Sequence, residues 1–202
     1  IEIAVRVFKN SDNQCNWHSF IKPPHPISSS VQAMTGITNI DVNNAPDFKE
    51  IAHELFNLLS GKLLIAHNAN FDYSFLQNAF KTICLQFKAN VLCTHKLSRQ
   101  LYPEFNQHHL DALITRYDLK IKQRHRAMED TLAVQQFIEH CFVAFGGDKL
   151  NKVIKEIIKT PSLPTHLKTD IKCIPDSPGV YLFYNDPLKK PIYIGKSIHL
   201  KT

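Results

Sequence analysis

Two short stretches of the 202-residue sequence gather residue types that can do chemistry. In "IAHNANFDYSFL" (65–76), a short apolar run ends in a polar cluster, and Asp72 follows where helical spacing begins. In "HRAMEDTLAVQQF" (125–137), His125 precedes a second helical pattern and Asp130 lies five residues later. Carboxylate oxygens suit Mg²⁺ or Mn²⁺, and imidazole accepts a proton near neutral pH. This combination suits metal-assisted phosphodiester hydrolysis with His125 as the general base.

Each stretch also has a simpler interpretation. An acidic residue near a helix start complements the helix dipole, and a histidine before a helix is often an ordinary surface residue. Two carboxylates are also too few, because a two-metal site usually needs about three or four acidic ligands. Glu2, alone at the start of the sequence, cannot fill both missing places. The residues by themselves leave the chemical and the simpler interpretations open.

The elements around these residues follow from hydrophobic periodicity and from turn residues. Apolar alternation or short apolar runs predict strands, and 3.6-residue spacing predicts helices. The predicted strands are residues 1–8, their hairpin partner 13–23, 62–67 and 90–94, and the predicted helices are residues 45–61, 70–80, 95–101, 109–117 and 127–142. Thr94 is placed to cap the helix that follows it, and the segment with Gly36 is predicted to be a loop. A hairpin followed by alternating strands and helices predicts an α/β layer with a mixed sheet.

The carboxy-terminal part has a different pattern. Gly146 and Gly147 interrupt the helical spacing, and residues 149–159 predict a separate helix rich in lysine. Residues 160–170 contain two prolines and predict a linker, and an apolar segment starts at Gly179. The excess of basic residues lies in this part of the chain, which favours polyanions such as nucleic acid as partners.

Composition excludes several classes of protein. The chain is 44% hydrophobic, yet it has no apolar run as long as a membrane span and no signal-peptide pattern, so we expect a cytoplasmic protein that does not bind membranes. Five scattered cysteines without a Cys-x-x-Cys pair predict reduced thiols. Both ends of the sequence lie inside structural patterns, so we expect a fragment of a longer chain.

Three motifs in the first part of the sequence resemble those of one enzyme family. "TGIT" (35–38), "AHNANFD" (66–72) and "HRAMED" (125–130) resemble the second and third motifs of the DEDDh 3′–5′ exonucleases, in particular the proofreading epsilon subunit of bacterial DNA polymerase III. The resemblance covers residues 1 to about 143. In that family an Asp-x-Glu motif lies on the strand before the one that matches "IEIA", so two metal ligands are expected upstream of this sequence.

The resemblance implies a fold and roles for individual residues. It implies an RNase H-like mixed sheet flanked by helices and a two-metal site that holds Mg²⁺ or Mn²⁺. Asp72 and Asp130 become metal ligands and His125 the general base. Asn68 and Phe71 are expected to touch the terminal nucleotide of a single-stranded 3′ end.

A second resemblance concerns the end of the chain. "PGVYLFYNDPLKKPIYIGKSIHLK" resembles the start of the GIY-YIG nuclease domains of bacterial excision-repair nucleases, with residues 179–181 and 193–195 as the two triplets. Eleven residues separate the two tyrosines, as the family hairpin requires. The resemblance implies that Tyr181, Tyr193 and Lys196 belong to a nuclease centre whose remaining residues lie further downstream.

These inferences predict three regions and one principal function. Residues 1–143 form the exonuclease domain, 144–174 a basic helix and linker, and 175–202 the beginning of a small α+β GIY-YIG domain. The expected function is metal-dependent 3′–5′ hydrolysis of DNA in replication or repair. The expected partners are DNA and a DNA polymerase or repair complex. The alternatives are an RNA 3′–5′ exonuclease and a catalytically silent nucleic-acid-binding module. Residues 1–202 by themselves are expected to be inactive, because half of the metal ligands are missing.

Overall fold

A computed structural model of the chain describes residues 1–9, 12–159, 174–184, 191–198 and 200. The chain divides into two compact units, residues 1–159 and residues 160–202, and each is described by itself. Most of the predicted linker, residues 160–173, lies outside the described residues. The predicted boundaries at residues 143 and 174 stay predictions.

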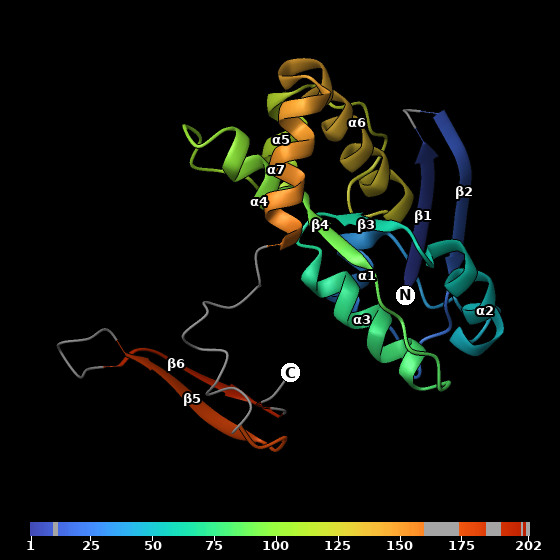
Figure 1. Cartoon of the computed structure of the whole chain (residues 1–202). Helices are drawn as coiled ribbons and strands as arrows, with labels where there is room; N and C mark the ends of the chain where they lie inside the picture. Colours follow the sequence, from blue (N-terminus) through green and yellow to red (C-terminus); the bar gives the residue numbers. More distant parts are fainter. Residues whose placement is uncertain (10–11, 160–173, 185–190, 199, 201–202) are drawn as a thin grey trace. The chain divides into compact units, whose positions relative to one another are not determined.

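The first unit contains four strands and seven helices among its described residues (Figure 1). In chain order these are β1 (Glu2–Lys9), β2 (Asp12–Phe20), α1 (Ser29–Thr35), α2 (Phe48–Leu59), β3 (Leu63–Ala66), α3 (Asn70–Lys81), β4 (Asn90–Cys93), α4 (Thr94–Leu101), α5 (Leu110–Arg116), α6 (Ala127–Phe145) and α7 (Gly147–Lys159). Every strand and helix predicted for this part of the sequence is present, with ends shifted by a few residues.

The strands form two separate pairs. β1 and β2 are antiparallel, with Glu2 opposite Phe20, and β3 and β4 are parallel, with Leu63 opposite Asn90. Within the described part of the chain, no strand hydrogen bonds join one pair to the other. The expectation of one mixed sheet is wrong in this respect, because the four strands of the first unit form two sheets of two strands each. Helix α6 contacts both β1 and β3 and so holds the two pairs together.

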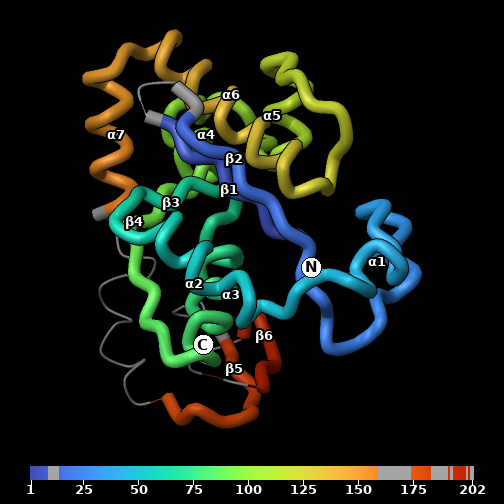
Figure 2. Tube along the Cα trace, turned by 90° about the vertical axis from the view of Figure 1, so that its right-hand side faces the viewer, coloured from blue at the N-terminus to red at the C-terminus, as the bar shows by residue number. Residues whose placement is uncertain are grey.

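Helices cover the strands on two sides (Figures 1 and 2). Helices α2 and α3 lie on one side of β3 and β4, and α4 to α7 lie on the other. Phe80 is fully buried in the first core and Phe137 in the second. The alternation of side chains along a strand explains how one strand serves both cores: Leu64 packs into the first and Ile65 into the second.

Local sequence explains where several helices begin and end. Helix α2 starts with a capping box, in which Asp47 and Glu50 each accept a hydrogen bond from the other's backbone N–H. Helix α1 lies in the segment that the sequence predicts as a loop. Four of its seven residues are polar, and it stops at Gly36, which adopts a left-handed φ of 70°. The predicted capping role of Thr94 is wrong: it is the first residue of α4, and no side chain caps that helix.

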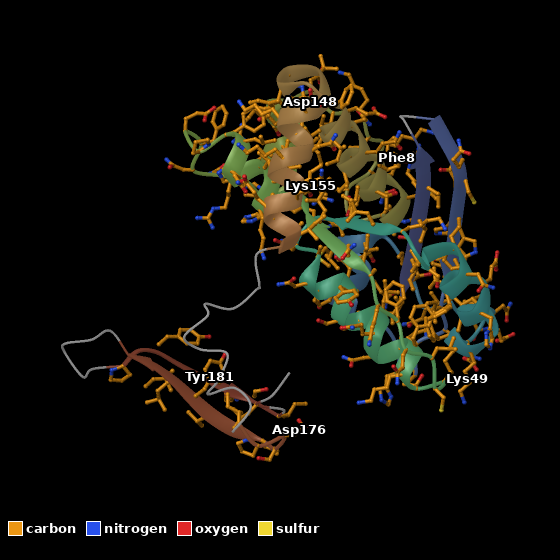
Figure 3. The ribbon with its side chains drawn as sticks, in the orientation of Figure 1. Phe8, Lys49, Asp148, Lys155, Asp176 and Tyr181 are labelled. Atoms are coloured by element: carbon orange, nitrogen blue, oxygen red, sulfur yellow. The ribbon has the colours of Figure 1, made fainter. Side chains whose placement is uncertain are left out.

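Helix α7 is the separate helix that the sequence predicts, and it lies within the first unit. Leu150 on its inner face is buried at 3% exposure, and the helix contacts α4, α6 and β4. The Gln100 amide of α4 donates a hydrogen bond of 3.0 Å to Glu156 of α7. Figure 3 labels Asp148 in the first turn of the helix and Lys155 further along it. An apolar face covered by its neighbours therefore anchors a helix whose other face is charged.

The second unit contains an antiparallel hairpin among its described residues. Strand β5 (Gly179–Tyr184) pairs with β6 (Pro191–Ser197), and Tyr181 lies opposite Gly195. The predicted apolar strand from Gly179 is thus present.

Two further expectations concern the whole chain. Among the described residues no helix is long and apolar enough to cross a membrane. The four described cysteines are free thiols, namely Cys15, Cys84, Cys93 and Cys141. The thiol of Cys173 lies outside the described residues.

Candidate active site

The carboxylate of Asp130 is held by a neighbouring arginine. Arg124 donates hydrogen bonds to Asp130, on the first turns of α6, and to Asp111, on the first turn of α5. Partial burial opposes the charge on Arg124, but these two hydrogen bonds outweigh that effect and raise the pKa of its guanidinium. Arg124 thus supplies the positive charge that balances two carboxylates at this point of the structure.

Two predicted site residues have unusual backbone conformations. His125 and Asn68 both have φ near 62°, in the left-handed region that residues other than glycine seldom adopt. Only four described non-glycine residues do so, the others being Cys84 and Asp118. Such conformations are often retained at functional sites, where the surrounding structure holds them in place. The side chain of His125 is exposed just before α6, as a general base requires access to its substrate.

A buried carboxylate fixes the segment that carries His125. The Glu2 side chain is only 5% exposed and accepts hydrogen bonds from the Arg126 guanidinium at 3.1 Å, from the Ala127 N–H at 2.9 Å and from His18 at 2.8 Å. Burial alone would raise the pKa of Glu2, but the hydrogen bonds from Arg126, Ala127 and His18 outweigh it and lower that pKa. Glu2 therefore ties β1 and β2 to the start of α6 directly after His125.

The polar cluster at the end of β3 is partly buried. Nδ1 of His67 lies 3.0 Å from Oγ1 of Thr94, whose hydroxyl also reaches the carbonyl of Ala66. Burial lowers the pKa of His67 to about 4, and the nearby positive potentials of His95 and Arg124 act in the same direction. Nε2 of His67 is buried and has no hydrogen-bond partner among the described residues. His67 is thus a neutral imidazole that positions the turn between β3 and α3.

Asp72 lies in the first turn of α3, next to an exposed aromatic ring. Phe71 is 77% exposed, so its face is free to contact a ligand. Asp72 keeps access to solvent, yet the protein atoms around it exclude enough water to raise the pKa of its carboxyl. No ion pair to Asp72 occurs within the residues that the structure describes. Its charge is left without a cation, in contrast to that of Asp130.

The donor set fits a metal only in part. Asp72 and Asp130 offer hard oxygen atoms of the kind that Mg²⁺ prefers. Within the described ranges, however, no three His, Cys, Asp or Glu side chains are grouped so that they could hold one ion. Asp72 and Asp130 belong to different elements, α3 and α6. These residues alone therefore do not form a complete metal site.

The hairpin of the second unit brings the two predicted tyrosines together. The ring centroids of Tyr181 and Tyr193 lie 6.0 Å apart, and a hydrogen bond with Tyr193 raises the pKa of Tyr181. A Cβ atom on Gly195 would lie 2.3 Å from the Tyr181 ring, so glycine makes room for that ring. Lys196 pairs with Val180 and, because successive residues of a strand face opposite sides, lies on the other face from the two tyrosines.

Sequence reasoning missed three charged residues that organise the candidate site. Arg124 and Asp111 bracket Asp130, and Arg126 binds Glu2. The run of basic residues in "QRHRAM" was the available signal, because adjacent arginines around a candidate base are positioned to pair with acidic residues nearby. The partner of Arg126, Glu2, is 124 residues away in sequence, so this pair could not be assigned without the structure.

Comparison with known proteins identifies the family. The model of the exonuclease family (RNase_T) matches residues 1–138. The chain is 32% identical over 176 residues to the PolC-type DNA polymerase III of Caldanaerobacter subterraneus subsp. tengcongensis, covering 87% of this chain and 12% of that protein. It is 36% identical over 135 residues to the PolC-type DNA polymerase III of Bacillus subtilis, covering 66% of this chain and 9% of that protein. The chain therefore spans about a tenth of the length of these relatives.

Solved structures with the same fold are also exonucleases. Exonuclease X in complex with 5′ overhanging duplex DNA matches with a TM-score of 0.58 and 22% identity, covering 76% of this chain and 89% of that one. The nuclease domain of 3′hExo, a DEDDh family member bound to rAMP, matches with a TM-score of 0.60 and 16% identity, covering 72% and 81%. At these identities the likeness shows the fold. The chain belongs to the exonuclease family (RNase_T), and its first unit has the α/β fold of these solved exonucleases.

Proposed function

We propose that this domain is a proofreading-type 3′–5′ exonuclease that removes nucleotides from a single-stranded DNA 3′ end. The observation that carries the proposal is the family match over residues 1–138, which includes Asp72, His125 and Asp130. The similarity to PolC-type DNA polymerases favours DNA as the substrate and a replicative polymerase or repair complex as the partner.

The roles of individual residues in this proposal follow from their chemistry. Asp72 and Asp130 would supply oxygen ligands to a divalent ion, Mg²⁺ or Mn²⁺, together with further acidic ligands. A bound divalent cation would stabilise the negative charge that develops on the scissile phosphate. His125, exposed and held in place by the segment that Glu2 fixes, takes the proton from the attacking water. The open face of Phe71 and the backbone at Asn68 contact the terminal nucleotide.

The second unit has a separate role in the proposal. The adjacent tyrosines of β5 and β6 support a GIY-YIG nuclease domain that begins near residue 175 and is coupled to the exonuclease. Tyr181, Tyr193 and Lys196 would then contribute to a second nuclease centre. Residues 1–202 by themselves are expected not to cleave nucleic acid, because the described residues hold no complete group of metal ligands.

An RNA exonuclease is the second candidate, and one observation favours it. A structural neighbour is a 3′-exonuclease that recognises a histone mRNA stem-loop, with a TM-score of 0.58 at 15% identity. Digestion of 5′-labelled DNA and RNA oligonucleotides of one sequence by the full-length gene product separates the two candidates. Faster shortening of the DNA supports the proposal, whereas faster shortening of the RNA overturns the choice of substrate. If neither is shortened, the catalytically silent binding module is the better account.

A further inference from the structure

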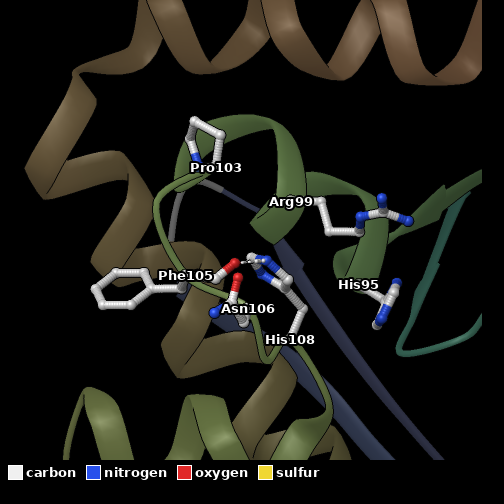
Figure 4. Close-up of a pocket in the computed structure, with 6 residues that line it drawn as sticks. All are labelled: His95, Arg99, Pro103, Phe105, Asn106 and His108. Atoms are coloured by element: carbon white, nitrogen blue, oxygen red, sulfur yellow. Dashed lines mark hydrogen bonds between the residues drawn. The ribbon is translucent and has the colours of Figure 1, made fainter.

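A polar pocket lies beside helix α4. Its volume is about 420 Å³, and Figure 4 shows six of its lining residues. They come from α4 and from the segment between α4 and α5, namely His95, Arg99, Pro103, Phe105, Asn106 and His108. The side chains of Arg99 and His95 project from α4 on the same side of the pocket. A cavity of this size falls in the range of small-molecule sites, about 300–1,000 Å³.

The charges in this pocket favour an anion. The lining contains a guanidinium, an amide and two imidazoles, but no carboxylate. Arg99 is exposed and makes no ion pair with any residue in the described part of the chain. Burial lowers the pKa of His95, and the charges acting on it, from His108, Arg99 and His109, all lower it further. The pocket therefore presents the positive charge of Arg99 next to an imidazole, His95, whose charged form is disfavoured.

Hydrogen bonds fix the loop that forms the other wall. Nε2 of His108 donates to the carbonyl oxygen of Phe105 at 2.8 Å, and Nδ1 of His108 lies 2.8 Å from the hydroxyl of Ser98. Because a carbonyl oxygen can only accept, Nε2 carries a proton. These contacts hold the segment that carries Asn106 against α4. Hydrogen bonds through His108 thus tie this wall of the pocket to α4.

The pocket is better suited to a phosphate than to a nucleobase. The ring of Phe105 turns away from Arg99 in Figure 4, and the Arg116 guanidinium lies 3.7 Å from its centroid. That face is therefore not free to stack on a base. A planar guanidinium, by contrast, matches the geometry of phosphate oxygens and can bind two of them.

The pocket also adjoins the candidate active site. The rings of His95 and His67 lie 5.6 Å apart, and His67 belongs to the turn that leads into Asp72. The wall of the pocket that His95 forms therefore lies next to the turn that leads into Asp72, so the pocket is a candidate contact for a strand whose 3′ end is bound there.

We propose that this pocket binds one phosphate group of the nucleic-acid strand upstream of its 3′ end, with Arg99 as the charged contact and Asn106 as a neutral donor. The inference rests on the proposed exonuclease function. A free nucleoside monophosphate carries the same chemistry and is the other possible source of the phosphate.

The test is the salt dependence of oligonucleotide binding by the full-length gene product, measured by fluorescence anisotropy with EDTA present so that no strand is cut. Arg99→Gln should weaken binding of single-stranded DNA about tenfold or more, as for a lost hydrogen bond to a charged group. It should also reduce the slope of log K against log salt by about 0.7, the value for one phosphate of a single strand. Lys96→Gln removes one charge from the same helix outside the pocket and should change affinity much less.

Each outcome has one meaning. If dAMP displaces the oligonucleotide from the wild-type protein but not from Arg99→Gln, the pocket binds a free nucleotide. If dAMP does not displace it and the salt slope depends on Arg99, the pocket binds a phosphate of the strand. Equal effects of Arg99→Gln and Lys96→Gln overturn the proposal. Exonuclease activity measured separately with Mg²⁺ distinguishes the two proposals. If the protein is active and Arg99→Gln does not change binding, only the proposal for the pocket is contradicted. If Arg99→Gln weakens binding and the protein is inactive, only the proposed exonuclease function is contradicted.

Discussion

The guanidinium of Arg124 forms an ion pair with the carboxylate of Asp130, the residue proposed as a metal ligand on α6. The same guanidinium pairs with Asp111 on α5, so one cation balances two acidic side chains. A divalent ion bound by Asp130 would take over part of this role, because it would neutralise the same carboxylate. Arg124 and the metal are therefore expected to compete for Asp130.

This competition gives the first prediction. Arg124→Gln in the full-length gene product should lower the Mn²⁺ concentration needed for half-maximal thermal stabilisation by about two- to fivefold. That factor corresponds to an ion pair of about 0.4–1 kcal/mol between partly exposed groups. The control is Arg99→Gln, which removes one positive charge from a residue that forms no ion pair with Asp130. An unchanged or higher Mn²⁺ requirement in Arg124→Gln would show that Arg124 does not compete.

The second prediction concerns His125 as the general base. His125→Asn keeps a residue that tolerates the left-handed backbone and removes the base, so it should slow DNA cleavage by about 10²–10⁴-fold. The melting temperature should change little, because the His125 side chain is exposed. If the rate is unchanged, His125 is an ordinary surface residue, and a fall in melting temperature together with rate would indicate a packing role.

The third prediction concerns the buried carboxylate of Glu2. Arg126→Ala removes one of its charged partners and should lower the free energy of unfolding by about 1.5–3 kcal/mol, as for a hydrogen bond to a charged group. Urea denaturation measures this change. Lys122→Ala removes an exposed charge from the same segment and should have an effect within about 0.5 kcal/mol. Equal effects of the two substitutions would mean that Glu2 gains no stability from Arg126.

The fourth prediction concerns pH. The pKa of His67 is about 4 in the folded protein and about 6.5 in an unfolded chain. As pH falls below about 6.5, the unfolded chain takes up this proton first, so the free energy of unfolding should decrease between pH 6.5 and pH 4. His95, whose pKa is also lowered, contributes in the same direction. His67→Gln should flatten this decrease, and an identical pH profile in wild type and mutant would refute the assignment.

The sequence predicts the local elements of this fold better than it predicts their association. The positions of α2, α3 and α6 follow from strong helical periodicity, which depends only on neighbouring residues. Periodicity does not reveal that the pair β1 and β2 is separate from the pair β3 and β4, because strand pairing depends on contacts between distant segments. Helix α1 was missed for a local reason, since seven mostly polar residues give a weak periodic signal.

The sequence likewise predicts some features of the candidate site and not others. The types and spacing of Asp72, His125 and Asp130 indicated hydrolytic chemistry and, by resemblance, the exonuclease family. The left-handed backbone of His125 and the ion pair between Arg124 and Asp130 depend on three-dimensional contacts that no spacing reveals.

The most direct test of the account is the rate at which the full-length gene product shortens a 5′-labelled single-stranded DNA from its 3′ end with Mg²⁺. The account predicts stepwise shortening by the wild type and a rate at least about 10²-fold lower in Asp130→Asn, since the metal would lose a ligand. Asp118→Asn makes the same change at a surface carboxylate that is 83% exposed, and it should retain the wild-type rate. Wild-type activity in Asp130→Asn, with the melting temperature unchanged, would contradict the placement of the active site.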